Sequence, residues 1–350
     1  MRRIAIFQRD LGVGGIQRAL LNLLHHIDFT RYRIDLYLCD KENFFECSFP
    51  KEIQVHYRPR LPYWCRFVPF FLLRHFFPRP RITEHYDVAI DFGGDHNETA
   101  LDCCICPADK RILFFHTDVG TKYRLNPKYR ILFGFFKGKF HCFDEFVAVS
   151  EGIVSPFRQV TGIKDKPIHV IPNYIDVPAV LEKSRETVDF QVDANRCNFV
   201  AVGRMCHPKG FDLLLEDFAK AVKRRDDLHL YFIGDGPDRG QLELLVSTLH
   251  LESHVTMLGG RPNPFPYMAL MDALVLTSRF EGQAIVVQEA RVLGLPVIAP
   301  KRLEKVNSLV HGVDNIADAL VSFQKTSKSP DLLEQYNASV LQKLDDLLCS

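Results

Sequence analysis

The stretch that decides the fold is Ser278-Arg279-Phe280-Glu281-Gly282-Gln283-Ala284-Ile285-Val286-Val287-Gln288-Glu289-Ala290. It follows an apolar run, 273–276, that predicts a buried strand, and its own second half predicts a helix. Gly282 lies where the strand would turn into the helix, and Gly294 is a natural residue to end that helix. A strand that turns directly into a helix is the building unit of an open α/β sheet.

Two carboxylates in this stretch are candidates for ligand binding. Glu281 falls in the strand-to-helix turn and Glu289 about two turns into the helix, so both side chains can face one cleft. In an open α/β sheet that cleft lies beyond the carboxyl ends of the strands. Ionised carboxylates accept hydrogen bonds, which suits a ligand rich in hydroxyl groups. Two solvated surface glutamates are an equally weighted alternative for this stretch taken alone.

The length of the chain and the distribution of its charge constrain its domain organisation and its partners. A chain of 350 residues predicts two domains of ordinary size. The formal net charge is +1, which does not favour nucleic-acid binding. Residues 1–180 hold 25 Lys and Arg against 20 Asp and Glu, whereas the remainder holds 19 against 23. This asymmetry suggests different partners for the two halves.

Cysteine spacing and hydropathy argue against several classes of protein. Among ten cysteines, Cys103 and Cys106 form one C-x-x-C, but no second pair follows at zinc-finger spacing. Free thiols are therefore favoured over a structural metal. The first residues lead directly into a strand-like segment rather than a signal peptide, which predicts a cytoplasmic protein. No apolar run reaches the roughly 18 residues that a membrane span needs.

The first half alternates predicted strands with helices or loops. Loop 10–15 ends in Gly14-Gly15, and 16–27 has helical periodicity, an order that can cradle a phosphate. Gln17 stands where a dinucleotide fingerprint needs its third glycine, and the P-loop lysine is absent, so neither NAD nor ATP is indicated. The predicted strands are 3–7, 33–38, 53–56, 88–91, 112–115 and 145–149, with a further strand end at 169–172. Such alternation predicts a parallel sheet with helices on both faces.

The second half repeats this alternation. Residues 173–195 are polar and aperiodic, which predicts a linker. The predicted strands beyond it are 198–202, 229–233, 254–258, 273–276 and 296–299, and the predicted helices are 211–224, 241–249, 264–271, 284–293, 316–323 and 332–348. The whole chain is thus predicted to be two α/β halves with a cleft between them.

Further candidate site residues follow strands. His116 lies just past 112–115, where site residues collect, although a buried structural histidine is the alternative. Arg204 and Lys209 lie in the loop before helix 211–224. Two cations beside a helix N-terminus can bind a diphosphate, and a solvated basic loop is the alternative. Loop 234–237 follows the neighbouring strand and should approach the same cleft.

Two segments stand out by composition. Residues 58–81 carry six arginines and residues 122–141 carry six Lys and Arg; both lack acidic residues and are rich in aromatics. Basic, aromatic segments suit an anionic membrane surface or a lipid-linked acceptor. Core-facing helices with a basic outer face are the next alternative, and nucleic acid is the least favoured.

Several motifs occur in an order that carries a family resemblance. They are Gly14-Gly15-Ile16-Gln17-Arg18, Phe115-His116-Thr117-Asp118, Val147-Ala148-Val149-Ser150-Glu151, Pro172-Asn173 with Asp176, Gly203-Arg204 with Lys209-Gly210, Gly234-Asp235-Gly236-Pro237, and Glu281 with seven residues before Glu289. In this order they resemble the retaining glycosyltransferases of family 4 (glycosyl transferases group 1), which have the GT-B fold of two Rossmann-like domains facing each other across a cleft. The resemblance covers most of the chain.

The resemblance implies a domain plan. Residues 1–172 would form an N-terminal acceptor-binding domain, and 196–325 a C-terminal nucleotide-sugar-binding domain. A linker at 173–195 would join them, and 326–350 would form a C-terminal helix. One segment departs from the family's pattern: 300–307 lacks the usual glycines, which leaves open the contacts to the ribose or base there.

The resemblance also implies roles for single residues. Arg204 and Lys209 would bind the diphosphate of a UDP- or GDP-linked sugar, Glu281 the sugar hydroxyls, and Glu289 the ribose. His116 would contact the donor sugar near its reacting carbon, so that His116, Glu281 and Lys209 form the catalytic set. The remaining donor-binding residues would be Gly14, Gly15, Gly282, Gln283 and Ala284. The family needs no metal, and no cofactor is expected.

The predicted function is transfer of a hexose to a glycan or lipid-linked acceptor in cell-surface polysaccharide or lipopolysaccharide synthesis. The protein would be cytoplasmic and peripheral on the inner face of the plasma membrane. The alternatives are a nucleotide-sugar epimerase or phosphorylase of similar architecture, and a glycan- or membrane-binding relative without catalysis.

Overall fold

The computed structural model describes all residues except 13, 41–48, 95, 189 and 308–309. The chain divides into two compact units: unit 1 comprises Met1–Tyr174 with Tyr336–Ser350, and unit 2 comprises Ile175–Gln335. Each unit contains one parallel sheet, so the predicted α/β fold class is confirmed. Parts of the predicted loop 10–15, of the linker and of segment 300–312 lie outside the described residues.

Unit 1 is built on a seven-stranded sheet with the order β3-β2-β1-β4-β5-β6-β7, in which every neighbouring pair is parallel. The strands are β1 (Arg2–Gln8), β2 (Tyr32–Leu38), β3 (Ile53–Tyr57), β4 (Tyr86–Asp91), β5 (Ala108–Phe115), β6 (Glu145–Ala148) and β7 (Ile168–Val170). Six of them coincide closely with the predicted strands, and the apolar runs of β1 and β5 are buried on both faces. The strand order reverses between β1 and β4, which makes their carboxyl ends the expected ligand crevice of this unit.

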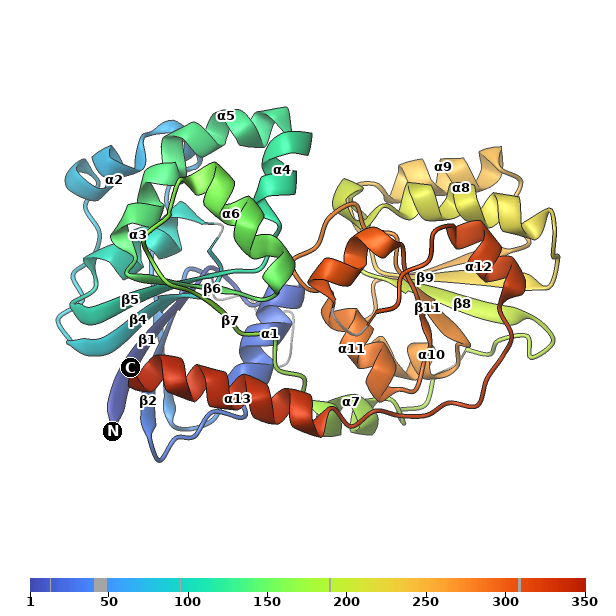
Figure 1. Cartoon of the computed structure of the whole chain (residues 1–350). Helices are drawn as coiled ribbons and strands as arrows, with labels where there is room; N and C mark the ends of the chain where they lie inside the picture. Colours follow the sequence, from blue (N-terminus) through green and yellow to red (C-terminus); the bar gives the residue numbers. More distant parts are fainter. Residues whose placement is uncertain (13, 41–48, 95, 189, 308–309) are drawn as a thin grey trace. The chain divides into compact units, whose positions relative to one another are not determined.

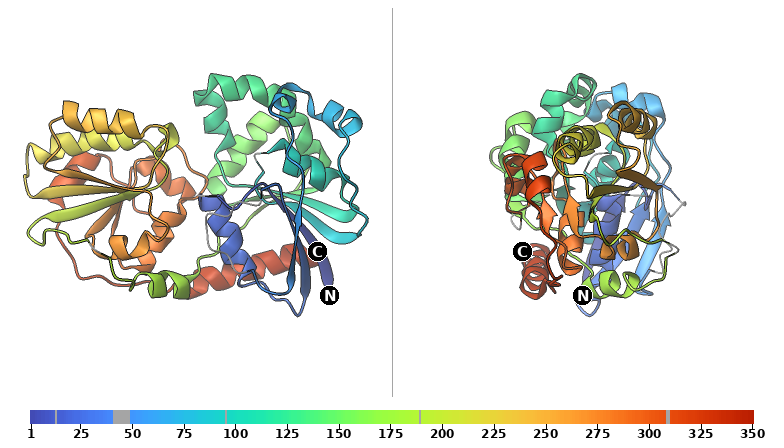
Figure 2. Two further views of the ribbon diagram at one scale, coloured as in Figure 1. Left: turned by 180° about the vertical axis from the view of Figure 1, so that it is seen from behind. Right: turned by 90° about the vertical axis from the view of Figure 1, so that its right-hand side faces the viewer.

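Helices cover both faces of the unit 1 sheet. Helices α3, α4, α5 and α6 lie above it in Figure 1, and α1 and α13 lie below; Figure 2 shows the same layers from behind. The helices of this unit are α1 (Gly15–Leu24), α2 (Phe70–Phe76), α3 (Asn97–Ile105), α4 (Val119–Leu125), α5 (Pro127–Phe136), α6 (Val154–Thr161) and α13 (Glu334–Cys349), with short 3₁₀ turns η1 (Tyr63–Phe67), η2 (Lys137–Cys142) and η3 (Glu151–Ile153).

Unit 2 has a five-stranded parallel sheet with the order β10-β9-β8-β11-β12. Its strands are β8 (Cys197–Val202), β9 (Leu228–Ile233), β10 (Val255–Gly259), β11 (Ala273–Val275) and β12 (Val297–Ile298). Its helical segments are α7 (Val177–Lys183), η4 (His207–Lys209), α8 (Phe211–Val222), α9 (Arg239–Thr248), α10 (Phe265–Ala269), α11 (Ile285–Val292), η5 (Lys301–Val306) and α12 (Ile316–Ser322). The strand order reverses between β8 and β11, so the loops that follow these two strands meet at the switch point.

The opening stretch has the structure that its sequence predicts. It leaves β11, turns through Glu281 and Gly282, and enters α11 at Ile285. Gly294 adopts the left-handed φ of 71°, and the Leu295 N–H donates to the Ala290 carbonyl at 2.8 Å. This is the glycine-ended helix terminus that the sequence indicates.

Two segments differ from the sequence-based expectation. The range predicted to be a linker contains α7, whose first turn is capped by the Asp176 side chain, which accepts from the Ala179 N–H at 3.0 Å. A cap and a proline, rather than periodicity, start this short helix. The second segment is 326–350, which was expected to be a C-terminal helix but is helical only over α13, from Glu334 to Cys349. The end of α13 is held within unit 1 by Arg31, which pairs with Asp345, and by Lys110, which donates to Ser350 Oγ at 2.7 Å.

Candidate functional site

The loop after β8, which carries Lys209, meets the loop after β11 at the switch point of unit 2. Gly210 has a φ of 63°, and a Cβ at this position would lie 2.5 Å from the Thr277 carbonyl oxygen. Only glycine permits both this backbone conformation and this approach. The Thr277 hydroxyl donates to the Gly210 carbonyl at 2.9 Å, so the loops after β8 and β11 are directly joined.

Lys209 and Glu281 come together at this junction. The Lys209 Nζ lies 2.6 Å from Glu281 Oε1, although the two residues are 72 positions apart. The buried Ser278 hydroxyl donates to the same carboxylate oxygen at 2.7 Å. The side chains of Lys209 and Glu281 are 23% and 13% exposed, so the ion pair is only partly solvated and can be reached by a ligand.

Arg204 is also in the loop after β8, and its side chain is exposed. The neighbouring loop after β9 packs against this loop, because the Met205 N–H donates to the Asp235 carbonyl at 2.9 Å. The expectation that loop 234–237 approaches the same edge is therefore confirmed.

A second ion pair, between Arg279 and Asp212, connects the stretch 278–290 to α8. Arg279 donates to both oxygens of Asp212 and to the His207 carbonyl. This hydrogen bonding lowers the pKa of the Asp212 carboxyl, against an opposing effect of burial. The pair links the first turn of α8 to the loop that carries Glu281.

The start of α11 differs from the expectation in one respect. We expected Ala284 among the donor-binding residues, but its N–H donates to the buried Asn307 Oδ1 at 3.0 Å. That N–H is therefore engaged within the protein. Gly282 is buried and Gln283 half-buried just before the helix, and Glu289 within the helix is 4% exposed.

The sequence analysis did not single out Ser278, Arg279 or Asn307 as contributors to this site. Ser278 and Arg279 belong to the stretch that decides the fold; Ser278 donates to Glu281 within the stretch, whereas Arg279 pairs with Asp212 of α8. Asn307 lies in the segment that departs from the family's pattern, and that departure was the only signal in the sequence.

The candidate residues of unit 1 follow β1 and β5. Gly14 and Gly15 form the N-terminus of α1, and Gln17 in its first turn donates to Asp10 Oδ1 at 3.1 Å. His116 follows β5, with its ring centroid 4.8 Å from that of Phe92. Because His116 belongs to unit 1, its role toward the residues of unit 2 stays a prediction.

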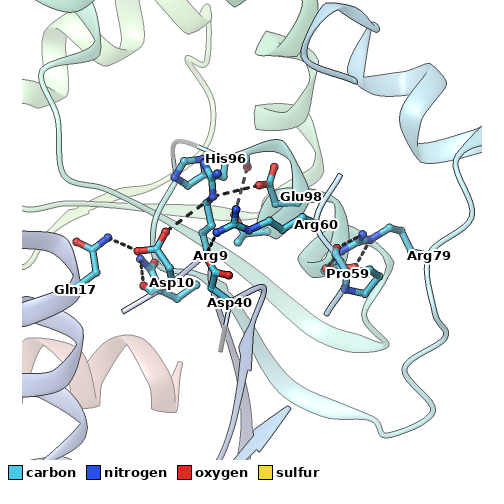
Figure 3. Close-up of polar contacts among 12 residues, drawn as sticks. Arg9, Asp10, Gln17, Asp40, Pro59, Arg60, Arg79, His96 and Glu98 are labelled. Carbon is cyan, nitrogen blue, oxygen red and sulfur yellow. Dashed lines mark hydrogen bonds and ion pairs between the residues drawn. The ribbon is translucent and has the colours of Figure 1, made fainter. Parts of the chain in front are cut away.

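A polar cluster occupies the switch point of unit 1 (Figure 3). Arg9, which follows β1, donates to His96 Nδ1 at 3.1 Å, and its Nε lies 3.6 Å from Glu98 Oε1 and 3.9 Å from Asp10 Oδ2. His96 and Glu98 follow β4, so the cluster draws on both strands at which the order reverses. The figure also shows Arg60 paired with Asp40 nearby. A site with donors and carboxylate acceptors side by side suits a hydroxyl-rich ligand.

The two basic aromatic segments, 58–81 and 122–141, contribute some side chains to the core of unit 1 and others to its surface. Phe70, Phe133 and Phe140 are buried, whereas Trp64 is 57%, Phe71 61% and Phe76 79% exposed. Helix α5 packs against η1, and α2 against η2. We call the exposed aromatic residues of η1 and α2 the aromatic surface of unit 1; they are Tyr63, Trp64, Phe67, Phe71 and Phe76.

Cysteine and membrane features can be stated for the part of the chain that the structure describes. There, Cys103, Cys104 and Cys106 are buried free thiols, and burial raises the pKa of Cys103. No group of three or more His, Cys, Asp or Glu side chains within these residues is placed to hold a metal ion. None of the helices in the described ranges has the length and apolarity to cross a membrane.

Two α/β units, each with one parallel sheet and polar residues at its switch point, place this chain in the class of two-domain proteins built from doubly wound α/β units. Two family models match consecutive parts of this chain: "Glycosyltransferase Family 4" over residues 13–178 and "Glycosyl transferases group 1" over residues 196–328. Together they span most of the chain. The chain therefore belongs to glycosyltransferase family 4, with the GT-B fold.

Similar proteins include several glycosyltransferases. The N-acetylgalactosamine-N,N'-diacetylbacillosaminyl-diphospho-undecaprenol 4-alpha-N-acetylgalactosaminyltransferase of Campylobacter jejuni is 24% identical over 316 residues, which cover 85% of this chain and 80% of that enzyme. The lipopolysaccharide core biosynthesis glycosyltransferase LpsD of Rhizobium meliloti is 30% identical over 155 residues, covering 44% and 43%. An uncharacterized glycosyltransferase of Methanocaldococcus jannaschii is 29% identical over 133 residues, covering 37% and 33%. The chain thus spans less than half of the latter two relatives.

Solved structures share the fold. TarM of S. aureus, in a complex that includes UDP, has a TM-score of 0.71 at 12% identity, and HepE of Anabaena with UDP and glucose has 0.70 at 18%. In both comparisons all of this chain and all of that chain are covered.

Proposed function

We propose that the protein is a retaining, metal-independent glycosyltransferase. It moves a hexose from a nucleotide-diphosphate sugar, with UDP or GDP as the nucleotide, to a hydroxyl of a glycan or lipid-linked acceptor. The observation that carries this proposal is the Lys209–Glu281 pair at the switch point of unit 2. It supplies one group suited to a diphosphate and one suited to sugar hydroxyls, side by side at the edge where ligands bind.

The donor is held by the loops after β8 and β11. Arg204 and Lys209 bind the diphosphate, together with the backbone of Gly282 and Gln283. Glu281 accepts hydrogen bonds from the sugar.

Two further residues and one helix end complete the donor assignment. Glu289 binds the ribose from α11. In unit 1, the N-terminus of α1 at Gly14 and Gly15 approaches the donor phosphate, and His116 contacts the sugar. These assignments rest on family membership and on placement: His116 follows a strand, Gly14 and Gly15 begin a helix, and Glu289 lies within α11.

The chemistry requires charge neutralisation on the leaving group. When the bond between the sugar and the diphosphate breaks, negative charge grows on the diphosphate oxygen. Lys209, which is held by Glu281, and the exposed Arg204 are cations in the loop before α8, and they can stabilise that charge without a metal ion. Lys209 must exchange part of its contact with Glu281 for the donor phosphate, which frees Glu281 for the sugar.

The acceptor is a saccharide bound by unit 1. The cluster of Arg9, Asp10, His96 and Glu98 offers donors and acceptors for hydroxyl groups at the carboxyl ends of β1 and β4. A lipid-linked saccharide also accounts for the aromatic surface of unit 1, which we propose rests on an anionic membrane at the cytoplasmic face. The Campylobacter relative is named for a diphospho-undecaprenol-linked acceptor and the Rhizobium relative for lipopolysaccharide core biosynthesis, and both names support this acceptor class.

Substitution of the ion pair tests the proposal. We expect Lys209→Ala and Glu281→Ala each to lower the rate of nucleoside diphosphate release from the donor by about 100-fold or more, since each removes a charged group that binds the donor or its leaving group. Lys220→Ala is the matched control, because Lys220 is an exposed lysine of α8 paired with Asp217. Rates are measured with a panel of UDP- and GDP-sugars, with and without EDTA.

The outcomes separate the alternatives. Full activity of both variants would remove the site assignment. Loss of activity in EDTA would remove the metal-independent mechanism. Donor binding without release of nucleoside diphosphate would favour a non-catalytic relative or, if the sugar changes configuration, an epimerase.

A further inference from the structure

The segment that departs from the family's pattern makes direct contacts with the stretch that carries Glu281. It comprises η5 and Asn307, directly after β12. Two contacts hold the segment against the residues that follow it. Pro300 forms a parallel bridge with Val313, and the Gly312 N–H donates to Glu304 Oε1 at 2.7 Å. The segment is therefore held in a defined conformation next to the switch point.

Asn307 contacts the middle of the stretch, where α11 begins. Its side chain is 1% exposed, and its Oδ1 accepts from the Ala284 N–H at 3.0 Å. Its own N–H donates to the carbonyls of Leu303 and Glu304, both at 3.1 Å, so the residue is fixed by η5. Ala284 is the N-cap residue of α11 and has no side-chain cap of its own. Asn307 thus supplies, from another segment, a fixed point at the start of α11 that Ala284 cannot supply itself.

Arg302 contacts the beginning of the stretch. Its guanidinium donates to the Thr277 carbonyl at 2.7 Å and to the Ser278 carbonyl at 3.2 Å. Partial burial of the guanidinium and the neighbouring Arg279 lower the pKa of Arg302, although the residue as a whole is exposed. The carbonyls that it binds belong to the strand end from which the loop carrying Glu281 departs.

We infer that Asn307 and Arg302 are positioning residues of the donor site. Arg302 holds the loop where it leaves β11, and Asn307 holds it where it enters α11. Between these two points lie Glu281 and the peptide groups of Gly282 and Gln283. A shift of about 1 Å in such a loop is enough to weaken ligand binding substantially. This inference rests on the proposed function, because it assigns these contacts to the same donor site.

The test compares two pairs of matched variants in the full chain. Asn307→Ala is paired with Asn315→Ala, which removes the same kind of contact, an Asn side chain accepting from the Asp318 N–H, at the start of α12. Arg302→Ala is paired with Arg225→Ala, because Arg225 also donates to two main-chain carbonyls of unit 2, those of Val321 and Phe323. The probes are UDP and GDP, and the dissociation constant (Kd) is measured by titration calorimetry alongside Tm.

We expect Asn307→Ala and Asn315→Ala to lower Tm by similar amounts, about 2–4 °C, because each removes one cap at a helix start. Only Asn307→Ala and Arg302→Ala should raise the Kd of the nucleotide, by about fivefold or more. Arg302 is exposed, so its variant keeps the test decisive if Asn307→Ala does not fold.

Two other outcomes overturn the inference in distinguishable ways. If the unchanged protein binds UDP or GDP and all four variants bind it within twofold, the segment does not position the site, while the proposed function stands. If the unchanged protein binds neither nucleotide, the donor site itself is absent, and both the proposed function and this inference fail.

Discussion

At the residue scale, the ion pair of Lys209 and Glu281 brings together two opposite charges from two different loops, those after β8 and β11. The pair is partly solvated and each member has a second anchor: Ser278 donates to Glu281, and η4 ends at Lys209. Each charged group is thus held in place before a ligand arrives. Preorganised charges cost less reorganisation when the ligand binds.

A prediction at this scale concerns Arg9 in unit 1. We expect Arg9→Ala to raise the acceptor KM by about tenfold or more, because a charged hydrogen-bond donor contributes about 1.5–3 kcal/mol to binding. The donor KM should not change. The acceptor for this measurement is the methyl glycoside that most stimulates nucleoside diphosphate release by the unchanged protein.

Arg33→Ala is the control for that experiment. Arg33 is an exposed arginine in the same unit, near the amino end of β2 and away from the carboxyl ends of the strands. An equal acceptor KM for Arg9→Ala and the unchanged protein would contradict the assignment of this cluster.

At the element scale, the loops after β9, β8 and β11, three neighbouring strands of the unit 2 sheet, are joined to one another and to α8. Arg279 ties the loop after β11 to the first turn of α8, and Met205 ties the loop after β8 to the loop after β9. The site is therefore supported by side chains and peptide groups from several elements rather than by one rigid helix.

The Asp212–Arg279 pair predicts a defined pH dependence. The folded-state pKa of Asp212 is lowered, so its ionised form stabilises the fold above the ordinary carboxyl range and loses this effect as the pH falls through the folded pKa. We expect Asp212→Asn to lower Tm by a constant amount from pH 8 to about pH 5, and the difference to shrink only below about pH 4. Scanning calorimetry across this pH range measures the Tm of Asp212→Asn and of the unchanged protein.

The control variant is Asp226→Asn, which removes an exposed carboxylate of the same unit. Its Tm should stay close to that of the unchanged protein at every pH. A Tm difference for Asp212→Asn that grows as the pH falls would contradict the assigned sign.

At the scale of the whole molecule, the aromatic surface of unit 1 predicts binding to anionic membranes. Exposed Trp64 and Phe71 lie among arginines and no acidic residue in segment 58–81. We expect the protein to sediment with vesicles that contain phosphatidylglycerol and to be released by added salt. Replacement of Trp64 and Phe71 by serine should reduce this binding.

Leu244→Ser is the matched control, because Leu244 is 69% exposed on α9 of unit 2. Equal binding to vesicles of pure phosphatidylcholine, or no binding to either kind, would argue against electrostatic attachment.

Much of the fold could be predicted from the sequence because its signals are local. Apolar runs of strand length and helical periodicity between them indicated most strands of both sheets, and the left-handed Gly294 was expected at the end of α11. Helix α7 was missed because a capping aspartate, rather than periodicity, starts it. The exposed half of the basic aromatic segments could not be separated from the buried half, since both halves contain the same residue types.

The sequence by itself determined the alternating units, the strand ends on which Arg204, Lys209 and Glu281 lie, and the family resemblance. Only the tertiary structure decided which of these residues touch. Lys209 meets Glu281 because β8 and β11 are neighbours across the switch point, although β9 and β10 separate them along the chain. Asn307 reaches Ala284 for the same reason, since β12 lies next to β11 and delivers η5 to the start of α11. Such contacts depend on strand order, which is a property of the packed sheet and has no local signal in the chain.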